Sequence, residues 1–176
     1  MNVYLTGLRG SGKSTVGRVL AERIGWEFSD QDELVVQRAE CSVADIFARG
    51  GELEFRRLES EILRELAGRS GVVVAAGGGV VLSEENRSLM RNSGLVIHLD
   101  GPADVFVRRI VADPMSGEAR PALTGETDDL KEMQLVAGRR APLYEAARHA
   151  WVSAVDAPEK VAERIQTIMR ERGVIS

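Results

Sequence analysis

GLRGSGKS, at residues 7–14, is the stretch that says most about the fold of this chain. It follows an apolar run over residues 2–6 and precedes residues with helical spacing. The phosphate-binding loop pattern G-x-x-x-x-G-K-[ST] requires this strand–loop–helix context. Its glycines let backbone N–H groups converge on an anion, Lys13 supplies charge for the β- and γ-phosphates, and Ser14 supplies a hydroxyl for Mg²⁺. The stretch predicts a nucleotide-binding loop, against the alternative of a glycine-rich turn.

Composition narrows the class of protein further. The chain has 176 residues, 44% hydrophobic and 28% charged, with a net charge of −4, as expected of one globular domain over residues 1–176. The acidic balance argues against a nucleic-acid partner. A single cysteine, Cys41, suits a reducing compartment, and the sequence shows neither a secretion signal nor an apolar run of membrane length. We expect a cytoplasmic protein with no membrane partner, and a monomer.

Strand and helix patterns alternate along the whole chain. This alternation predicts an α/β fold in which five parallel strands are covered by helices on both faces. The predicted strands cover residues 2–6, 26–29, 72–76, 95–99 and 151–155. The predicted helices cover residues 13–24, 33–38, 42–48, 52–67, 84–92, 102–110 and 128–150, and a last one begins at Pro158.

Two carboxylates, Asp30 and Asp32, lie at the predicted carboxyl end of strand 26–29. In an open parallel sheet, ligands bind outside the carboxyl ends of the strands, so this pair would face the phosphate loop. Phosphoryl transfer needs an acid near the magnesium nucleotide and a base for the acceptor hydroxyl. The alternative is that one of the two aspartates caps helix 33–38.

Two arginines, Arg56 and Arg57, lie near the start of helix 52–67. An arginine pair on one helical turn suits a ligand that carries a carboxylate. The alternative is a solvated charged face, because glutamates at helical spacing are available to both side chains: Glu52 and Glu59 for Arg56, and Glu54 and Glu61 for Arg57.

Later stretches of the chain add further candidates. Three glycines at 77–79 follow the buried strand 72–76 and allow close approach to a ligand, unless they form only a flexible turn. Residues from about 112 to 127 lose all periodicity, which is typical of a lid or a disordered link. We expect a lid, and this segment carries Arg120, unless that residue is an incidental loop arginine. We expect His98 to be a core histidine and His149 to be a cation in the last turn of helix 128–150. Pro142 should end or kink that helix near Arg140.

Together and in this order, these stretches resemble the shikimate kinase family over nearly the whole chain. The motifs are GLRGSGKS at 7–14, DQD at 30–32, ADIF at 44–47, EFRRLE at 54–59, GGG at 77–79, RP at 120–121 and RAPLY at 140–144. The resemblance implies a three-layer P-loop kinase fold with strand order 2-3-1-4-5. It also implies transfer of the γ-phosphoryl group of ATP to the 3-hydroxyl of shikimate, on the route to chorismate and the aromatic amino acids, with Mg²⁺ as cofactor.

The resemblance assigns site residues as well. It implies catalytic roles for Lys13, Asp32 as base and Arg120 in the lid, and a metal site formed by Ser14 and, through water, Asp30. The implied ATP-binding residues are Gly10, Ser11, Gly12, Lys13, Ser14, Thr15, Arg109, Arg120 and Pro158, with Arg109 and Pro158 on either side of adenine. The implied shikimate-binding residues are Asp32, Phe47, Phe55, Arg56, Gly77, Gly78, Gly79 and Arg140, mostly within a substrate-binding region over about 31–61.

One departure and two alternatives accompany this interpretation. The family usually has R-P-L-L at the lid, where this chain has R-P-A-L at 120–123, and the stretch between Arg109 and Arg120 is longer than is common. Another small-metabolite kinase of the same fold, such as one that acts on gluconate, is an alternative. So is a non-catalytic nucleotide-binding domain, although such a domain would be expected to lack Lys13, Asp32 or Arg120.

Overall fold

The computed structural model describes residues 1–112 and 128–176. Its strands are β1 (Asn2–Thr6), β2 (Glu27–Asp30), β3 (Val72–Ala75), β4 (Gly94–Asp100) and β5 (Ala150–Ser153). Its helices are α1 (Lys13–Ile24), α2 (Gln31–Ala39), α3 (Val43–Ala67), η1 (Val80–Leu82), α4 (Glu84–Ser93), α5 (Ala103–Ala112), α6 (Asp129–Ala147) and α7 (Pro158–Glu171). Among these residues, no helix is long and apolar enough to cross a bilayer.

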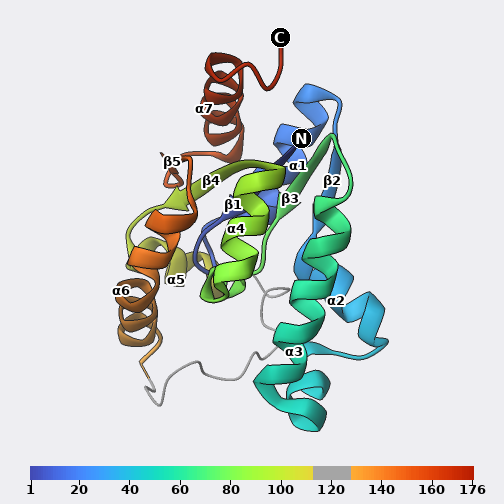
Figure 1. Ribbon diagram of the computed structural model, residues 1–176. Helices are drawn as coiled ribbons and strands as arrows, with labels where there is room; N and C mark the ends of the chain where they lie inside the picture. The colour runs from blue at the N-terminus through green and yellow to red at the C-terminus, as the bar shows by residue number, and fades with distance from the viewer. Residues whose placement is uncertain (113–127) are drawn as a thin grey trace.

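The strands form one sheet in the order β2-β3-β1-β4-β5, and every neighbouring pair is parallel. The predicted α/β class and strand order are therefore confirmed. The central strands consist of apolar, largely β-branched residues because helices cover both faces of the sheet. In β1, for example, Val3, Tyr4 and Leu5 are fully buried. Helix α1 packs against α7, whereas α3, α4 and α6 pack in succession, with α4 lying in front of the sheet in Figure 1.

The register of the sheet gathers three chain segments at one edge. Leu5 of β1 and Asp30 of β2 both pair with Ala75 of β3, so these three strands end at nearly the same level. The phosphate loop, the aspartate pair and the three glycines each follow one of these strand ends. The edge at which α/β proteins bind ligands thus carries the segments that the sequence singled out.

The boundary between β2 and α2 shows why the predicted helix 33–38 began too late. Asp30 is the N-cap of α2, and its Oδ1 accepts hydrogen bonds from the backbone N–H groups of Asp32 and Glu33 at 3.0 and 3.4 Å. The cap starts the helix directly at Gln31. The capping alternative is therefore confirmed for Asp30.

The helices predicted over 42–48 and 52–67 are confirmed as two helical segments of α3, because the backbone between them is non-helical at Gly51, where φ is 66° and ψ −168°.

Two predictions at the end of α6 need correction. Helix α6 continues through Pro142 to Ala147, so of the two predicted outcomes, an end or a kink near Arg140, the end is excluded, and the helix stops three residues before the predicted residue 150. His149 lies beyond α6, and its Nδ1 accepts from the Val96 N–H at 3.0 Å. Burial, Arg91 and Arg172 lower its pKa, so the prediction of a helix-end cation is wrong.

Candidate active site

The phosphate loop ends at the N-terminus of α1, which lacks the usual helix cap. Its N-cap residue is Gly12, in the left-handed region with φ 87°, and no side chain within the described structure caps it. The first turn contains no acidic residue. The first N–H groups of the helix and the positive end of its dipole are thus available to an anion.

Gly10 fixes the position of this loop against α5. Its φ is 78°, and a Cβ atom there would lie 2.5 Å from the Phe106 carbonyl oxygen. No other residue fits both the conformation and the close approach. Within the described residues, the buried Ser11 Oγ beside it has no hydrogen-bond partner.

Lys13 is folded back over its own loop. Its Nζ donates to the carbonyl oxygens of Gly7 and Leu8, both at 3.0 Å. These neutral acceptors hold the ammonium group at the mouth of the loop, where the sequence predicts the phosphates of a nucleotide.

One short hydrogen bond connects the phosphate loop to the aspartate pair. Ser14 Oγ donates to Asp30 Oδ2 at 2.5 Å. A hydroxyl and a carboxylate form a donor set that suits Mg²⁺, which prefers oxygen ligands and usually combines one or two protein groups with phosphates and water. Residues 1–112 and 128–176 contain no group of three or more His, Cys, Asp or Glu side chains that could hold a metal ion.

A second part of the site is built around the three glycines after β3. We call it the acceptor side, because the sequence predicts that the substrate that accepts the phosphoryl group binds there. A Cβ atom on Gly77 would lie 2.4 Å from Glu59 Oε1 and 3.0 Å from Asp32 Oδ1, so both carboxylates lie against this backbone. A Cβ atom on Gly79 would lie 2.2 Å from Arg56 Nη1. Helices α2 and α3 therefore place Asp32, Glu59 and Arg56 on one run of glycine backbone.

The two arginines of α3 have different environments. Arg57 is 54% exposed and pairs with Glu54 and Glu61, so the solvated-face interpretation holds for it. Arg56 is 23% exposed and pairs with the buried Glu59 at 2.8 Å and with the exposed Glu52 at 3.2 Å. Burial opposes its charge, but the two glutamates together raise the pKa of Arg56 above its ordinary value. The ion pairs that helical spacing predicted for Arg56 and for Arg57 are thus all present.

Arg140 reaches the glycines from α6. Its guanidinium is largely buried, and Nη1 donates to the Gly78 carbonyl oxygen at 2.9 Å. The Tyr144 hydroxyl donates to the same oxygen at 2.9 Å. Burial raises the pKa of Tyr144, so its hydroxyl stays protonated and able to donate. The sequence singled out Tyr144 only as part of a motif, not as a site residue.

Tyr144 in turn rests on His98 of β4. Their rings stack with centroids 4.4 Å apart and planes inclined by 26°. His98 is a core residue, as predicted, and burial lowers its pKa to about 4. A neutral imidazole thus supports the acceptor side from within the sheet.

The remaining predicted residues lie at the edges of this arrangement. Phe55 is buried and its ring centroid lies 5.3 Å from that of the half-buried Phe47.

The other predicted nucleotide-binding residues lie on α1, α5 and α7. Arg109 donates to the carbonyl oxygens of Ala154 and Val155 at 2.7 and 3.1 Å, in the segment that leads to Pro158 at the start of α7. Thr15 lies in the first turn of α1. The predicted lid and Arg120 lie outside the described residues.

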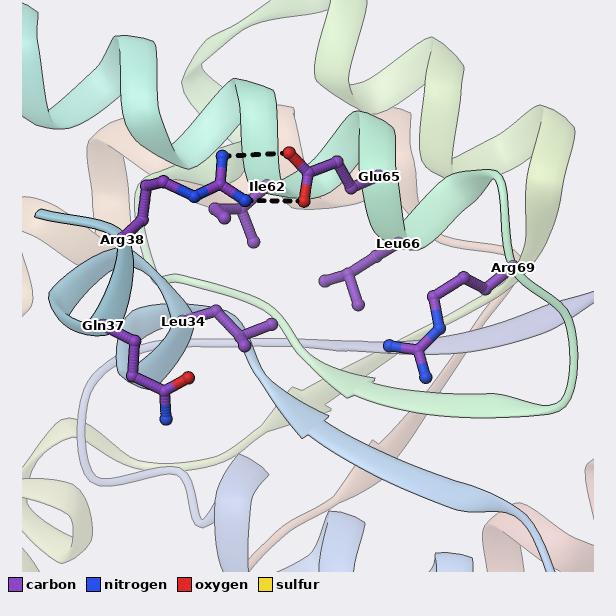
Figure 2. A pocket seen from close by; sticks show the side chains of 7 residues that line it. All are labelled: Leu34, Gln37, Arg38, Ile62, Glu65, Leu66 and Arg69. Carbon is purple, nitrogen blue, oxygen red and sulfur yellow. Dashed lines mark hydrogen bonds and ion pairs between the residues drawn. The ribbon is translucent and has the colours of Figure 1, made fainter.

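Two pockets flank α3. One has a volume of about 290 Å³, and its lining includes Arg56, Glu59 and Gly79, so it borders the acceptor side. The other, of about 280 Å³, lies between α2 and α3 and contains none of the predicted site residues. Figure 2 shows that two hydrogen bonds join Arg38 to Glu65 in its lining, and Arg69, the other arginine of the lining, pairs with Glu27, so both cations have carboxylate partners.

Comparison with known proteins gives a consistent result. The family model for shikimate kinase matches residues 9–170. A shikimate kinase of Nitratidesulfovibrio vulgaris is 49% identical over 148 residues, which are 84% of this chain and 83% of that protein. A shikimate kinase of Oleidesulfovibrio alaskensis is 40% identical over 97% of this chain and 98% of its own length.

Solved structures agree with the sequence relatives. Shikimate kinase from Acinetobacter baumannii, solved in complex with shikimate, superposes with a TM-score of 0.89 at 31% identity, covering 97% of this chain and 93% of that one. The enzyme from Aquifex aeolicus has a TM-score of 0.81 at 32% identity, with both chains fully covered. A gluconokinase from Sinorhizobium meliloti, at 16% identity and a TM-score of 0.54 over 97% of this chain and 96% of that one, shares the fold.

Proposed function

This chain belongs to the shikimate kinase family and is an ATP-dependent phosphotransferase, and we propose that it transfers the γ-phosphoryl group of ATP to the 3-hydroxyl of shikimate. The products are shikimate 3-phosphate and ADP. The observation that carries the proposal is the 2.5 Å hydrogen bond between Ser14 and Asp30. It joins the donor loop to Asp30, the cap of the helix whose first turn carries Asp32, so that nucleotide and acceptor would bind on either side of this contact.

The donor half binds the nucleotide mainly through its backbone. The N–H groups of residues 10–15 would cradle the phosphates, because α1 begins there without a cap. Lys13 would exchange the carbonyls of Gly7 and Leu8 for phosphate oxygens, which are better acceptors because they are charged. Arg109 and Pro158 would hold the adenine ring between α5 and α7.

The acceptor half matches a small polyol with one carboxylate. Arg56 and Arg140 would bind that carboxylate, since the guanidinium fork can bond both of its oxygens. Gly77, Gly78 and Gly79 would let the ring approach the backbone, with Phe55 and Phe47 behind it. Asp32 would orient the hydroxyls of shikimate and accept the proton of the one that attacks.

Ser14 and Asp30 would hold Mg²⁺, the second of them through water. When bound, the ion would neutralise charge on the transferred phosphoryl group. Lys13 would add a fixed positive charge on the same side, and in the proposed mechanism Arg120 would add another from the lid. The chain's own task is therefore to position two anionic substrates and to remove one proton.

We also propose that the protein is a monomer in the cytoplasm. The lone Cys41 supports a reducing compartment, and ATP as the donor supports a location where nucleotides are plentiful. Light scattering of the purified chain would test the first part, with a single species of about 19.2 kDa expected.

An acceptor panel tests the proposed reaction. ADP release would be measured with shikimate, gluconate, deoxyadenosine and buffer alone, with Asp32→Asn as the matched inactive protein. We expect ADP above the buffer level with shikimate only, and phosphorus–proton NMR coupling at the C3 position of the product. Equal ADP release with shikimate and buffer, together with turnover of another acceptor, would contradict the proposal.

A further inference from the structure

Gln31 lies between the two aspartates of the DQD stretch, yet its environment differs from theirs. Asp30 and Asp32 are part-exposed, whereas Gln31 is fully buried. It is the first residue of α2, and its side chain points into the contact between α2, α3 and the loop after β3. A buried amide at this position must have partners for both its donor and its acceptor.

Both partners are backbone groups of the acceptor half. Gln31 Nε2 donates to the Glu59 carbonyl oxygen of α3 at 2.7 Å. Gln31 Oε1 accepts from the N–H of Gly77 at 2.9 Å. One side chain thus hydrogen-bonds α2 both to α3 and to the loop after β3.

The residues that Gln31 joins are those that face the acceptor. The side chain of Glu59 binds Arg56 Nη1 at 2.8 Å. The Glu59 and Asp32 carboxylates both lie against Gly77, at 2.4 and 3.0 Å from the position of a Cβ atom there. The spacing between Asp32, Arg56 and the glycine backbone therefore depends on how α2, α3 and the loop are held together.

We propose that Gln31 is a positioning residue for the acceptor: its amide fixes Gly77 and α3 relative to Asp32, so that the carboxylate-binding arginine and the proposed base lie at the spacing that shikimate requires. This inference rests on the proposed function. Gln31 itself touches neither substrate, because its buried amide is occupied by Glu59 and Gly77.

The chemistry of the side chain explains why glutamine suits this position. The site needs a donor toward a carbonyl and an acceptor for an N–H at the end of one side chain of this length. Methionine has similar size and neither group. A protonated glutamic acid has both, whereas an ionised one keeps only the acceptor and directs negative charge toward the Glu59 carbonyl.

Two variants and a matched control test the proposal. Gln31→Met removes both hydrogen bonds, Gln31→Glu makes them dependent on protonation, and Gln37→Met makes the same change at an exposed position of α2. KM for shikimate, KM for ATP, kcat and Tm would be measured for each full-length protein at pH 6 and pH 8. The charged groups around Gly77, from which Gln31 accepts, are the carboxylates of Asp32 on α2 and Glu59 on α3, and Glu59 in turn binds Arg56.

We expect Gln31→Met to raise KM for shikimate about tenfold at both pH values and to leave KM for ATP within twofold of wild type. Gln31→Glu should show the same rise at pH 8 and recover toward the wild-type value at pH 6, because burial beside two carboxylates favours its protonated form. Gln37→Met should match wild type throughout.

A lower Tm with an unchanged KM for shikimate would overturn the proposal, because it would leave Gln31 with a purely structural role. An equal rise in both KM values would also overturn it. If Gln31→Met does not fold, the KM values of Gln31→Glu at pH 8 decide: a rise for shikimate but not for ATP supports the proposal, and an equal rise or none overturns it. Wild-type turnover of shikimate tests the proposed function separately. Should the panel identify a different acceptor, the variant-to-wild-type ratios are measured with that acceptor.

Discussion

The donor and acceptor halves of this site are built in opposite ways. The phosphate-binding part of the donor half is one contiguous stretch, residues 7–14, that presents backbone N–H groups and one lysine, and only the proposed adenine contacts, Arg109 and Pro158, come from elsewhere in the chain. The acceptor half is assembled from side chains of α2, α3 and α6 around a glycine backbone. The donor half can form from local sequence, whereas the acceptor half exists only once three helices have packed.

The two halves also hold their cations differently before substrate arrives. Lys13 donates to neutral carbonyls of its own loop, so exchanging them for phosphate oxygens strengthens its hydrogen bonds. Arg56 already pairs with two carboxylates, so the carboxylate of shikimate must displace or share one of them, and the net gain is smaller than that of pairing a free guanidinium. We infer that the donor half is preorganised and that acceptor binding involves competition with this chain's own glutamates.

The largest expected effect comes from Asp32→Asn, which changes the acceptor half alone. We expect kcat to fall about a thousandfold, roughly 4 kcal/mol in the activation barrier, because a general base is lost. KM for ATP should stay within twofold, as measured by ADP release, with Asp129→Asn on the exposed start of α6 as control. A parallel loss of ATP affinity would show that the two halves are not separable.

Arg56→Ala should weaken shikimate binding about a hundredfold, or about 2.7 kcal/mol, because a charge-assisted pair in a largely buried position is lost. Arg57→Ala is the matched control, since it is the next residue on the same helix and pairs with two glutamates in solvent. Calorimetric titration with shikimate measures both. Equal Kd values for the two variants would assign Arg56 to the solvated face.

His98 lies beneath the acceptor half, and its burial predicts a pH dependence of stability. The native pKa is about 4, below the ordinary value near 6.5, so the unfolded chain takes up a proton first as pH falls. Stability is full above pH 6.5 and is lost toward pH 4. We expect about 2 kcal/mol of unfolding free energy to be lost between pH 7.5 and pH 5.

Urea unfolding at several pH values checks this expectation. His98→Gln should be less stable than wild type at pH 7.5, yet its unfolding free energy should change less between the two pH values. His149→Gln is the control. Burial lowers the pKa of His149 as well, but its side chain is only half-buried. An unchanged pH dependence in His98→Gln would locate the titrating group elsewhere.

The smallest expected effect tests competition within the acceptor half. Glu52 is exposed and pairs with Arg56, and exposed pairs contribute about 0.2–1 kcal/mol. Glu52→Gln should therefore tighten shikimate binding about twofold, whereas Glu54→Gln, which releases Arg57 instead, should leave it unchanged. Weaker binding in Glu52→Gln would mean that Glu52 supports the bound position of Arg56.

The sequence predicted the donor half of the site better than the acceptor half. The phosphate loop and the α/β class came from local pattern, because periodicity and glycine spacing report directly on backbone structure. The strand order and the shikimate pocket came from the resemblance to a family. The ion pairs of Arg56 and Arg57 were predicted from helical spacing alone and are present.

The residues that sequence reasoning missed act through partners far away in the chain. Gln31 bonds groups 28 and 46 residues further on, and Tyr144 bonds a carbonyl 66 residues before it. No local pattern records such pairings. The late start predicted for α2 has a local cause, since either aspartate could have capped the helix. The proline in α6 left both an end and a kink open, and the helix continues through it.

Asp30 combines two roles, and other residue types can replace it in only one of them. It caps α2 through Oδ1 and meets Ser14 through Oδ2, and asparagine caps a helix about as well as aspartate. A descendant that lost the chemistry would still be selected to keep a capping residue there, for the sake of its stability. When genomes are searched for working relatives, a capping residue other than aspartate at position 30 would therefore mark a relative that keeps the fold without the proposed metal site.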